Sequence, residues 1–156
     1  MFSPDKWFGS GEFYNGVATQ SLRMVDSDTS HLTMTHPGAG NTKTWTWSGW
    51  VKRTKTATND ILFSQFTTNS DVVWTYFSAG DQLNFQSYEG SNQIDIKTTN
   101  KFRDTSSWYH IVVVQDTTEV TDTNRAKMYV NGKLQTDLVS TTYPNKDTDL
   151  KMNNGD

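Results

Sequence analysis

Apolar and polar residues alternate with a period of two along most of the chain from residue 21 onward. In QLNFQSY (82–88), Leu83 and Phe85 alternate with polar residues, and QIDIK (93–97) repeats the pattern. This spacing places the apolar side chains on one face of an extended strand. WYHIVVVQD (108–116) is apolar at successive positions, which predicts a central strand covered on both faces.

Turn residues separate these runs. AKMYVNGKLQ (126–135) alternates as far as Asn131-Gly132, a pair that tolerates positive φ and predicts a tight hairpin. Similar turn chemistry occurs at 36–41, 67–71, 78–81 and 88–92. About ten short strands with no helical period are typical of an all-β fold, and we predict a two-sheet antiparallel sandwich.

Three tryptophans lie close together in TWTWSGWVK (44–52). Trp45 and Trp47 share the apolar face with Gly49, so we interpret both as core residues whose replacement by alanine costs roughly 3–5 kcal/mol. Trp50 is out of phase, and two alternatives stay open: it lies on the Thr/Ser face, or a bulge at 48–49 turns it inward. The predicted core is Trp45, Trp47, Phe63, Phe85, Ile94, Ile96, Ile111, Val113 and Met128.

Composition narrows the functional classes. Aromatic residues make up 13% of the chain against 33% for all hydrophobic residues, so a few large rings should dominate the core. The net charge is −3 and no basic run exceeds two residues, so we expect no binding to nucleic acid. The absence of cysteine excludes disulfides, Cys-based zinc sites and a thiol nucleophile.

The first twenty residues mix Gly, Ser and aromatic residues without periodicity, so we interpret 1–20 as an arm and 21–156 as the folded domain. The arm rings Trp7, Phe8, Phe13 and Tyr14 are expected to dock on this domain or on a neighbour. The N-terminus lacks a secretion signal and no apolar run is long enough to span a bilayer. We therefore expect a soluble protein without membrane contact, exported if at all by cell lysis.

Five segments, taken in order, resemble successive strands of laminin-G-like (concanavalin A-like) domains: 44–53, 60–66, 83–89, 108–116 and 126–133. WYHIVVVQD followed by MYVNGK is the most specific part, and QSLRMVDSDTSHLTMT (20–35) resembles the first strands of that fold. The Thr-rich sequence of these segments is similar to that of domains in structural proteins of tailed, notably marine, bacteriophages. The resemblance implies a jelly roll and a virion decoration, fibre or adhesin at the particle surface.

Relatives of this kind usually continue past a loop like TTYPNKDTDLKMNNGD (141–156) into another strand or two. The sequence ends instead in NNGD, residues that are typical of a turn. We expect a fragment that lacks its last strands; the alternative is a partner that supplies the missing strand.

Catalysis is not expected. A glycosidase on this fold needs two carboxylates flanking the scissile bond, and the Glu-x-Asp-x-x-Glu strand of such enzymes is absent. The three glutamates, Glu12, Glu89 and Glu119, lie in the arm or in loop-like stretches. A nucleophilic triad is equally unsupported. His110 alternates with Trp108 and Val112 on one strand, which favours a packed or hydrogen-bonded ring, and no Gly-x-Ser-x-Gly motif occurs.

Metal binding has weak support. Asp26 and Asp28 offer two hard oxygen ligands, and laminin-G-like domains sometimes hold calcium at a loop rim, but calcium takes six to eight oxygens. His31 and His36 lack the spacing of a zinc pair. We therefore expect no cofactor, with calcium as the single candidate.

Exposed rings are the best candidates for binding. Trp74 and Tyr76 share a face in DVVWTYFS (71–78), and Tyr88 is in phase with the polar residues of its strand. Together with Trp50 they predict a polar-aromatic sheet surface. Such a surface would bind host-surface glycans or dock other virion proteins, including further copies of the chain, and the sequence does not separate these uses.

Overall fold

A computed structural model describes residues 22–24, 30–35, 38–68 and 70–155. Residues 36–156 form one compact unit, which is described here by itself. In the preceding unit, the described residues 22–24 and 30–35 have no strand structure, so the first strands expected from the resemblance at 20–35 are not found there. Alternation alone does not make a strand, because a strand also needs a ladder partner.

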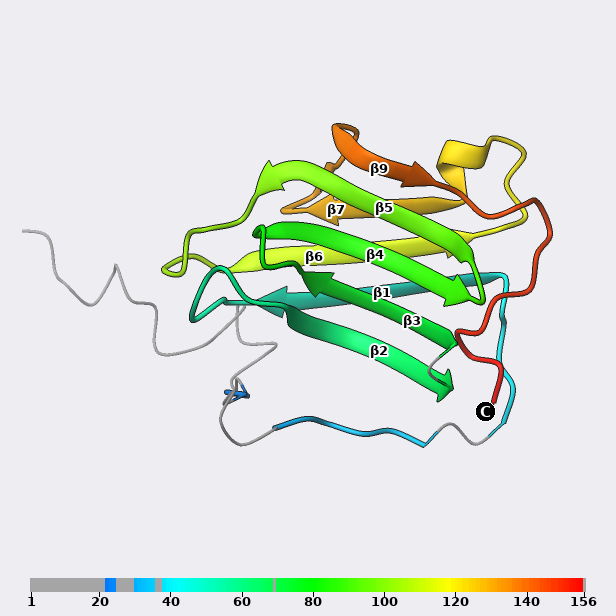
Figure 1. The fold of residues 1–156 in the computed structure, drawn as a ribbon, viewed down its shortest axis with the longest axis horizontal. Helices are drawn as coiled ribbons and strands as arrows, with labels where there is room; N and C mark the ends of the chain where they lie inside the picture. Colours follow the sequence, from blue (N-terminus) through cyan, green and yellow to red (C-terminus); the bar gives the residue numbers. More distant parts are fainter. Residues whose placement is uncertain (1–21, 25–29, 36–37, 69, 156) are drawn as a thin grey trace, which may run out of the picture. The chain divides into compact units, whose positions relative to one another are not determined.

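The folded unit is an all-β sandwich of two antiparallel sheets (Figure 1). The four-stranded sheet has the order β1-β6-β7-β8, and the five-stranded sheet has the order β2-β3-β4-β5-β9. The strands are β1 (Thr44–Val51), β2 (Asp60–Thr68), β3 (Asp71–Phe77), β4 (Gln82–Glu89), β5 (Asn92–Lys101), β6 (Tyr109–Asp116), β7 (Ala126–Val130), β8 (Lys133–Leu134) and β9 (Leu138–Thr142), with a short 3-10 helix η3 (Asp122–Asn124) before β7.

The predicted turns join neighbouring strands. Asn131 (φ 50°) and Gly132 (φ 78°) form the two-residue loop between β7 and β8, where Val130 pairs with Lys133. Asp81 has a φ of 65° in the β3–β4 turn, and Gly90 has a φ of 68° in the β4–β5 turn. Both values lie in the left-handed region that glycine and short polar residues tolerate. The hairpin expected from Asn-Gly is confirmed.

The core lies between the sheets and is most completely buried at β3, β4, β5, β6 and β7. Its inward residues come from alternate positions of these strands, as the period of two predicts. Six of the predicted core residues are at most 1% exposed: Phe85, Ile94, Ile96, Ile111, Val113 and Met128. The core also contains Val73, Phe77, Leu83 and Leu150, which are not among the nine predicted core residues, although the alternation at 82–88 places Leu83 on the same face as Phe85.

Trp45 and Trp47 face inward, as predicted, but they are only partly buried. Trp45 meets Phe63 and Phe85 edge-on at centroid distances of 5.7 and 5.5 Å. Trp47 stacks on Phe63 at 4.9 Å and 28°. These rings lie where β1 and β2 form the ends of their sheets, so fewer neighbours cover them. They are structural residues at the margin of the core.

The burial of β6 differs from the prediction that both of its faces are covered. The strand is central in its sheet, between β1 and β7. Its outward residues Val112 and Val114 are only partly buried, however, and just the alternate residues such as Ile111 and Val113 are fully covered. The described residues therefore do not cover both faces of β6. Valine is favoured in strands by its branched side chain even on an outward face, so the unbroken apolar run reflected strand propensity rather than burial on both sides.

Candidate functional site

The outer face of the five-stranded sheet carries two parallel rows of side chains, set by strand register. One row runs Trp74–Gln86–Asp95–Thr142 across β3, β4, β5 and β9. The adjacent row runs Tyr76–Asn84–Lys97–Ser140 across the same strands. Directly paired residues point to the same face of a sheet, and the intervening β3 residues Val73, Thr75 and Phe77 are fully buried on the other face. We call these eight residues the aromatic-polar platform; Asn84 is its one buried member, at 1% exposed.

The aromatic end of the platform is held in a defined orientation. Trp74 and Tyr76 lie 5.3 Å apart at 58°, and Phe66 of β2 meets Trp74 edge-on at 5.9 Å. The indole N–H of Trp74 donates to Gln86 Oε1 at 2.7 Å, and Gln86 Nε2 donates to Asn92 Oδ1 at 3.0 Å. These bonds leave few orientations for the indole.

The polar end of the platform supplies one carboxylate and one amine. Asp95 Oδ2 accepts a hydrogen bond of 2.8 Å from Ser140 Oγ, which orients the carboxylate. Lys97 lies two residues along β5 and therefore on the same face. Burial raises the pKa of Tyr76, with a smaller contribution from the Asp95 charge, so the phenol stays protonated and able to donate. The platform thus combines ring faces with hydrogen-bond donors and acceptors.

The structure brings three of the four predicted binding rings to this face. Tyr88 pairs with Val72 in the uninterrupted β3–β4 register, so it lies on the outer face with Trp74 and Tyr76, and it is partly exposed. Asp95, Lys97, Ser140 and Phe66 were not singled out from the sequence. The alternation in QIDIK indicates that Asp95 and Lys97 share a face, but no local pattern shows that this face adjoins Trp74.

Trp50 is separated from the other three rings. β1 pairs with β6 without a break from Thr44 to Val51, so no bulge turns Trp50 inward and the first alternative is confirmed. Trp50 is 40% exposed on the outer face of the four-stranded sheet, where its ring stacks on His110 at 5.0 Å. His110 Nε2 lies 2.9 Å from Ser48 Oγ. This cluster lies on the opposite side of the sandwich from the platform.

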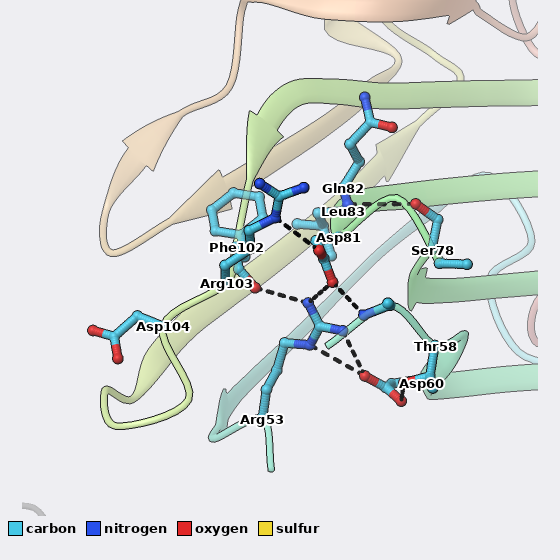
Figure 2. Close-up of polar contacts among 12 residues, drawn as sticks. Arg53, Thr58, Asp60, Ser78, Asp81, Gln82, Leu83, Phe102, Arg103 and Asp104 are labelled. Carbon is cyan, nitrogen blue, oxygen red and sulfur yellow. Dashed lines mark hydrogen bonds and ion pairs between the residues drawn. The ribbon is translucent and has the colours of Figure 1, made fainter. Parts of the chain in front are cut away.

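Arg53 is the centre of a buried ionic clamp (Figure 2). Its side chain is 1% exposed, and Nη1 donates to Asp81 Oδ1 at 3.0 Å and to the Phe102 carbonyl at 2.7 Å. Nε and Nη2 donate to Asp60 Oδ2 at 3.1 and 2.9 Å. The guanidinium also lies 4.7 Å from the centroid of the Phe77 ring.

Both carboxylate oxygens of Asp81 accept hydrogen bonds. Its Oδ1 accepts from the Ala57 backbone N–H at 2.8 Å, and its Oδ2 accepts from Arg103 Nε at 2.9 Å. These bonds, led by that of Ala57, lower the pKa of Asp81 to about 2. Because the buried charges of Arg53 and Asp81 are paired within the fold, the clamp ties the segment after β1 to the β3–β4 turn.

A carboxylate pair lies at the other end of the five-stranded sheet. Asp71 and Glu89 are directly opposite in register. Glu89 Oε1 accepts from the Lys151 backbone N–H at 3.0 Å, and Lys151 Nζ lies 3.8 Å from Asp71 Oδ2. Burial raises the pKa of Glu89. These contacts hold the segment around Leu150 against the end of the sandwich.

Several predicted residues lie outside the described part of the chain. These are the arm rings Trp7, Phe8, Phe13 and Tyr14, the arm glutamate Glu12, the calcium candidates Asp26 and Asp28, and His36. Among the residues that are described, no group of three or more His, Cys, Asp or Glu is arranged to hold a metal ion. The same residues include no helix of the length and apolarity that crossing a membrane requires.

Comparison with known proteins identifies a family. No curated protein and no solved structure matches the chain significantly. A family model described as the concanavalin A-like lectin/glucanases superfamily matches residues 26–156. That span includes every strand of both sheets, and the two-sheet antiparallel architecture agrees with it. The chain therefore belongs to the concanavalin A-like lectin/glucanase superfamily.

Proposed function

We propose that this domain is a non-catalytic carbohydrate-binding module and that the aromatic-polar platform is its binding surface. The observation that carries the proposal is the register that places Trp74 and Tyr76 beside the polar rows of β4, β5 and β9. A sugar ring presents apolar C–H faces and a periphery of hydroxyl groups. The aromatic faces match the C–H faces of the sugar. The oriented carboxylate, the Gln86 amide and the hydroxyls match its hydroxyl groups, whereas the Asn84 amide is buried.

The arrangement of carboxylates supports binding without hydrolysis. Within the two rows, Asp95 is the one carboxylate. A retaining glycosidase needs two carboxyl groups about 5–5.5 Å apart, and an inverting enzyme needs them about 6.5–9.5 Å apart. Asp71 and Glu89 do form a pair, but both are engaged by Lys151 at the end of the sandwich. They are better suited to anchoring the polypeptide than to acid–base chemistry.

The test is binding of the purified protein to a panel of polysaccharides and cell-surface glycans, with calcium and again with chelator. Trp74→Ala should weaken binding at least about tenfold, since stacking and burial of the ring are both lost. Trp50→Ala is the matched control, because it removes an exposed indole from the opposite sheet. Equal losses for both variants, or no saturable binding by folded protein, would contradict the proposal. Loss on chelation would instead implicate Asp26 and Asp28.

A second proposal concerns where the module acts. The Thr-rich segments of the chain resemble domains of bacteriophage structural proteins. From this resemblance we infer that the module is an adhesive or decorative component on the surface of a bacteriophage particle, in contact with other virion proteins and further copies of itself. One structural feature favours protein contacts: Ile61 and Phe66 of β2 are 52% and 55% exposed beside the platform. Such apolar side chains at a sheet margin suit an interface.

This second proposal has its own test. The protein should co-purify with purified particles at a fixed copy number, and Phe66→Ser should reduce its incorporation. A particle fraction without the protein would contradict the virion assignment while leaving glycan binding unaffected. The two proposals can therefore be tested independently.

A further inference from the structure

A cavity of about 280 Å³ opens between the two sheets at the edge formed by β7, β8 and β9. This edge lies on the other side of the sandwich from β1 and β2 (Figure 1). Buried Ile96, Ala126 and Met128 line its inner part, and the apolar side chains of Leu134, Leu138 and Tyr143 contribute to its walls. We call it the edge cavity.

Local features of the sequence account for the opening. Ala126 is the smallest of the inward residues of β7, the others being Met128 and Val130. β8 ends after two residues, and the β5–β9 register shifts between Lys97 and Thr98. The small side chain leaves space inside, and the short and irregular edge strands do not close it. The interior of a protein is otherwise packed with few such voids.

The polar lining of the edge cavity comes from Lys127 and from the neutral residues Thr123, Asn124, Gln135 and Thr136, and the Asp122 carboxylate lies close enough to act on Tyr143. Gln135 is already engaged: its Oε1 accepts from Asn100 at 3.2 Å and its Nε2 donates to the Lys133 carbonyl at 2.9 Å. By contrast, the Tyr143 hydroxyl and the Asn124 side-chain amide have no hydrogen-bond partner within the described part of the chain. Burial raises the pKa of Tyr143, so its hydroxyl remains a donor.

We propose that the edge cavity binds a small neutral molecule with an aliphatic or alicyclic body and a single hydroxyl or amide group. The apolar inner lining cannot satisfy the many hydroxyls of a sugar, because each buried polar group without a partner costs free energy. An apolar body displaces water from this lining favourably, while the head group pairs with Tyr143 or Asn124. The chemistry is thus distinct from that of the platform, which presents polar groups in rows.

The size is consistent with such a ligand. A volume of about 280 Å³ corresponds to roughly nine water molecules at about 30 Å³ each. It lies just below the range of about 300–1,000 Å³ for small-molecule sites. A six-membered carbon ring with one substituent fits this space.

The experiment compares two probes that share a six-carbon ring. The protein carrying ¹³C-labelled methyl groups is titrated with cyclohexanol, which has one hydroxyl, and with myo-inositol, which has a hydroxyl on every carbon. We expect saturable shifts of the Met128, Leu138 and Ile96 methyl resonances with cyclohexanol and none with myo-inositol. Absence of shifts with cyclohexanol, or equal shifts with both probes, would overturn the proposal.

Substitutions test whether cyclohexanol binds in the edge cavity. Ala126→Leu fills the inner part of the cavity and should abolish the cyclohexanol shifts while the thermal midpoint is kept or raised. Ala126→Val, which adds less volume, serves if the leucine variant does not fold. Tyr143→Phe should weaken binding about 2–10-fold, the effect of one neutral hydrogen bond. Val139→Ala, at an exposed position of the same strand β9, should leave it unchanged. A folded Ala126→Leu protein that still binds cyclohexanol would place the site elsewhere.

Discussion

Gly49→Ala is the substitution for which the structure makes the sharpest prediction. Gly49 lies on the inner side of β1, and a Cβ atom there would be 2.8 Å from Cη2 and 2.9 Å from Cζ2 of Trp47. The indole of Trp47 therefore covers the glycine backbone, an arrangement that compensates for a missing side chain in an edge strand. The same indole stacks on Phe63. A methyl group at residue 49 must push the ring away from that contact.

Two opposing effects set the magnitude. Replacing glycine by alanine reduces the entropy of the unfolded chain, which stabilises the fold by about 0.4–1 kcal/mol. Forcing an extra methyl group into packed side chains costs about 1–3 kcal/mol. The net expectation is a loss of about 1–2 kcal/mol in the free energy of unfolding. For a domain of this size that is a fall of about 2–8 °C in the thermal midpoint.

The assay is urea and thermal unfolding followed by circular dichroism and tryptophan fluorescence. Gly38→Ala is the control, because among the described residues, its chain neighbours aside, no atom lies within 4 Å of a Cβ placed at that glycine. It should be neutral or slightly stabilising. The decisive measurement repeats Gly49→Ala in a Trp47→Leu background, where the indole is gone and the same substitution should become neutral or stabilising. An equal loss in both backgrounds would show that Trp47 does not cover Gly49.

Three further predictions follow from the core and the clamp. Phe85→Ala should cost about 3–5 kcal/mol in urea unfolding because the ring is fully buried, whereas Trp45→Ala should cost less than the sequence suggested because that indole is only partly buried; equal costs would contradict this ranking. Arg53→Met should cost about 3 kcal/mol, the lower end for a broken buried ion pair, because Arg103 still pairs with Asp81; an unchanged urea midpoint would argue against the clamp. The pKa of Asp81 falls from 3.8 to about 2 on folding, so its stabilising contribution is complete above about pH 4 and is lost as the pH drops toward 2. The thermal midpoint of Asp81→Asn should therefore depend less on pH than that of the wild type in this window, and parallel profiles would refute the assignment.

Local pattern was enough to predict much of the fold. Alternation located β4, β5 and β7, and it assigned Phe85, Ile94 and Met128 to the buried side. Asn131-Gly132 predicted its hairpin because both residues accept the left-handed backbone of the loop. These features depend on neighbouring residues along the chain, so they can be read without knowing the pairing of strands.

The candidate site was only partly visible in this way. The sequence indicated that Trp74, Tyr76 and Tyr88 lie on outward faces, and the structure places them on one sheet. The sequence could not show that Trp50 lies on the opposite sheet, or that Asp95 and Ser140 form a hydrogen bond between β5 and β9. Nor did it identify the Arg53–Asp81 clamp, whose two ends are 28 residues apart.

The alternating pattern by itself determined that the chain forms an antiparallel β-sandwich and which face of most strands is buried. Only the tertiary structure decided which strands share a sheet, and hence that the platform, the Trp50 cluster and the edge cavity are separate places on the molecule. The physical reason is the range of the interactions. A side chain's direction in a strand follows from its position in a two-residue repeat. The pairing of β1 with β6 and of β5 with β9 instead closes long loops of chain that contain other strands. Such pairings form only when the core contacts of the whole domain offset the entropy of closing those loops.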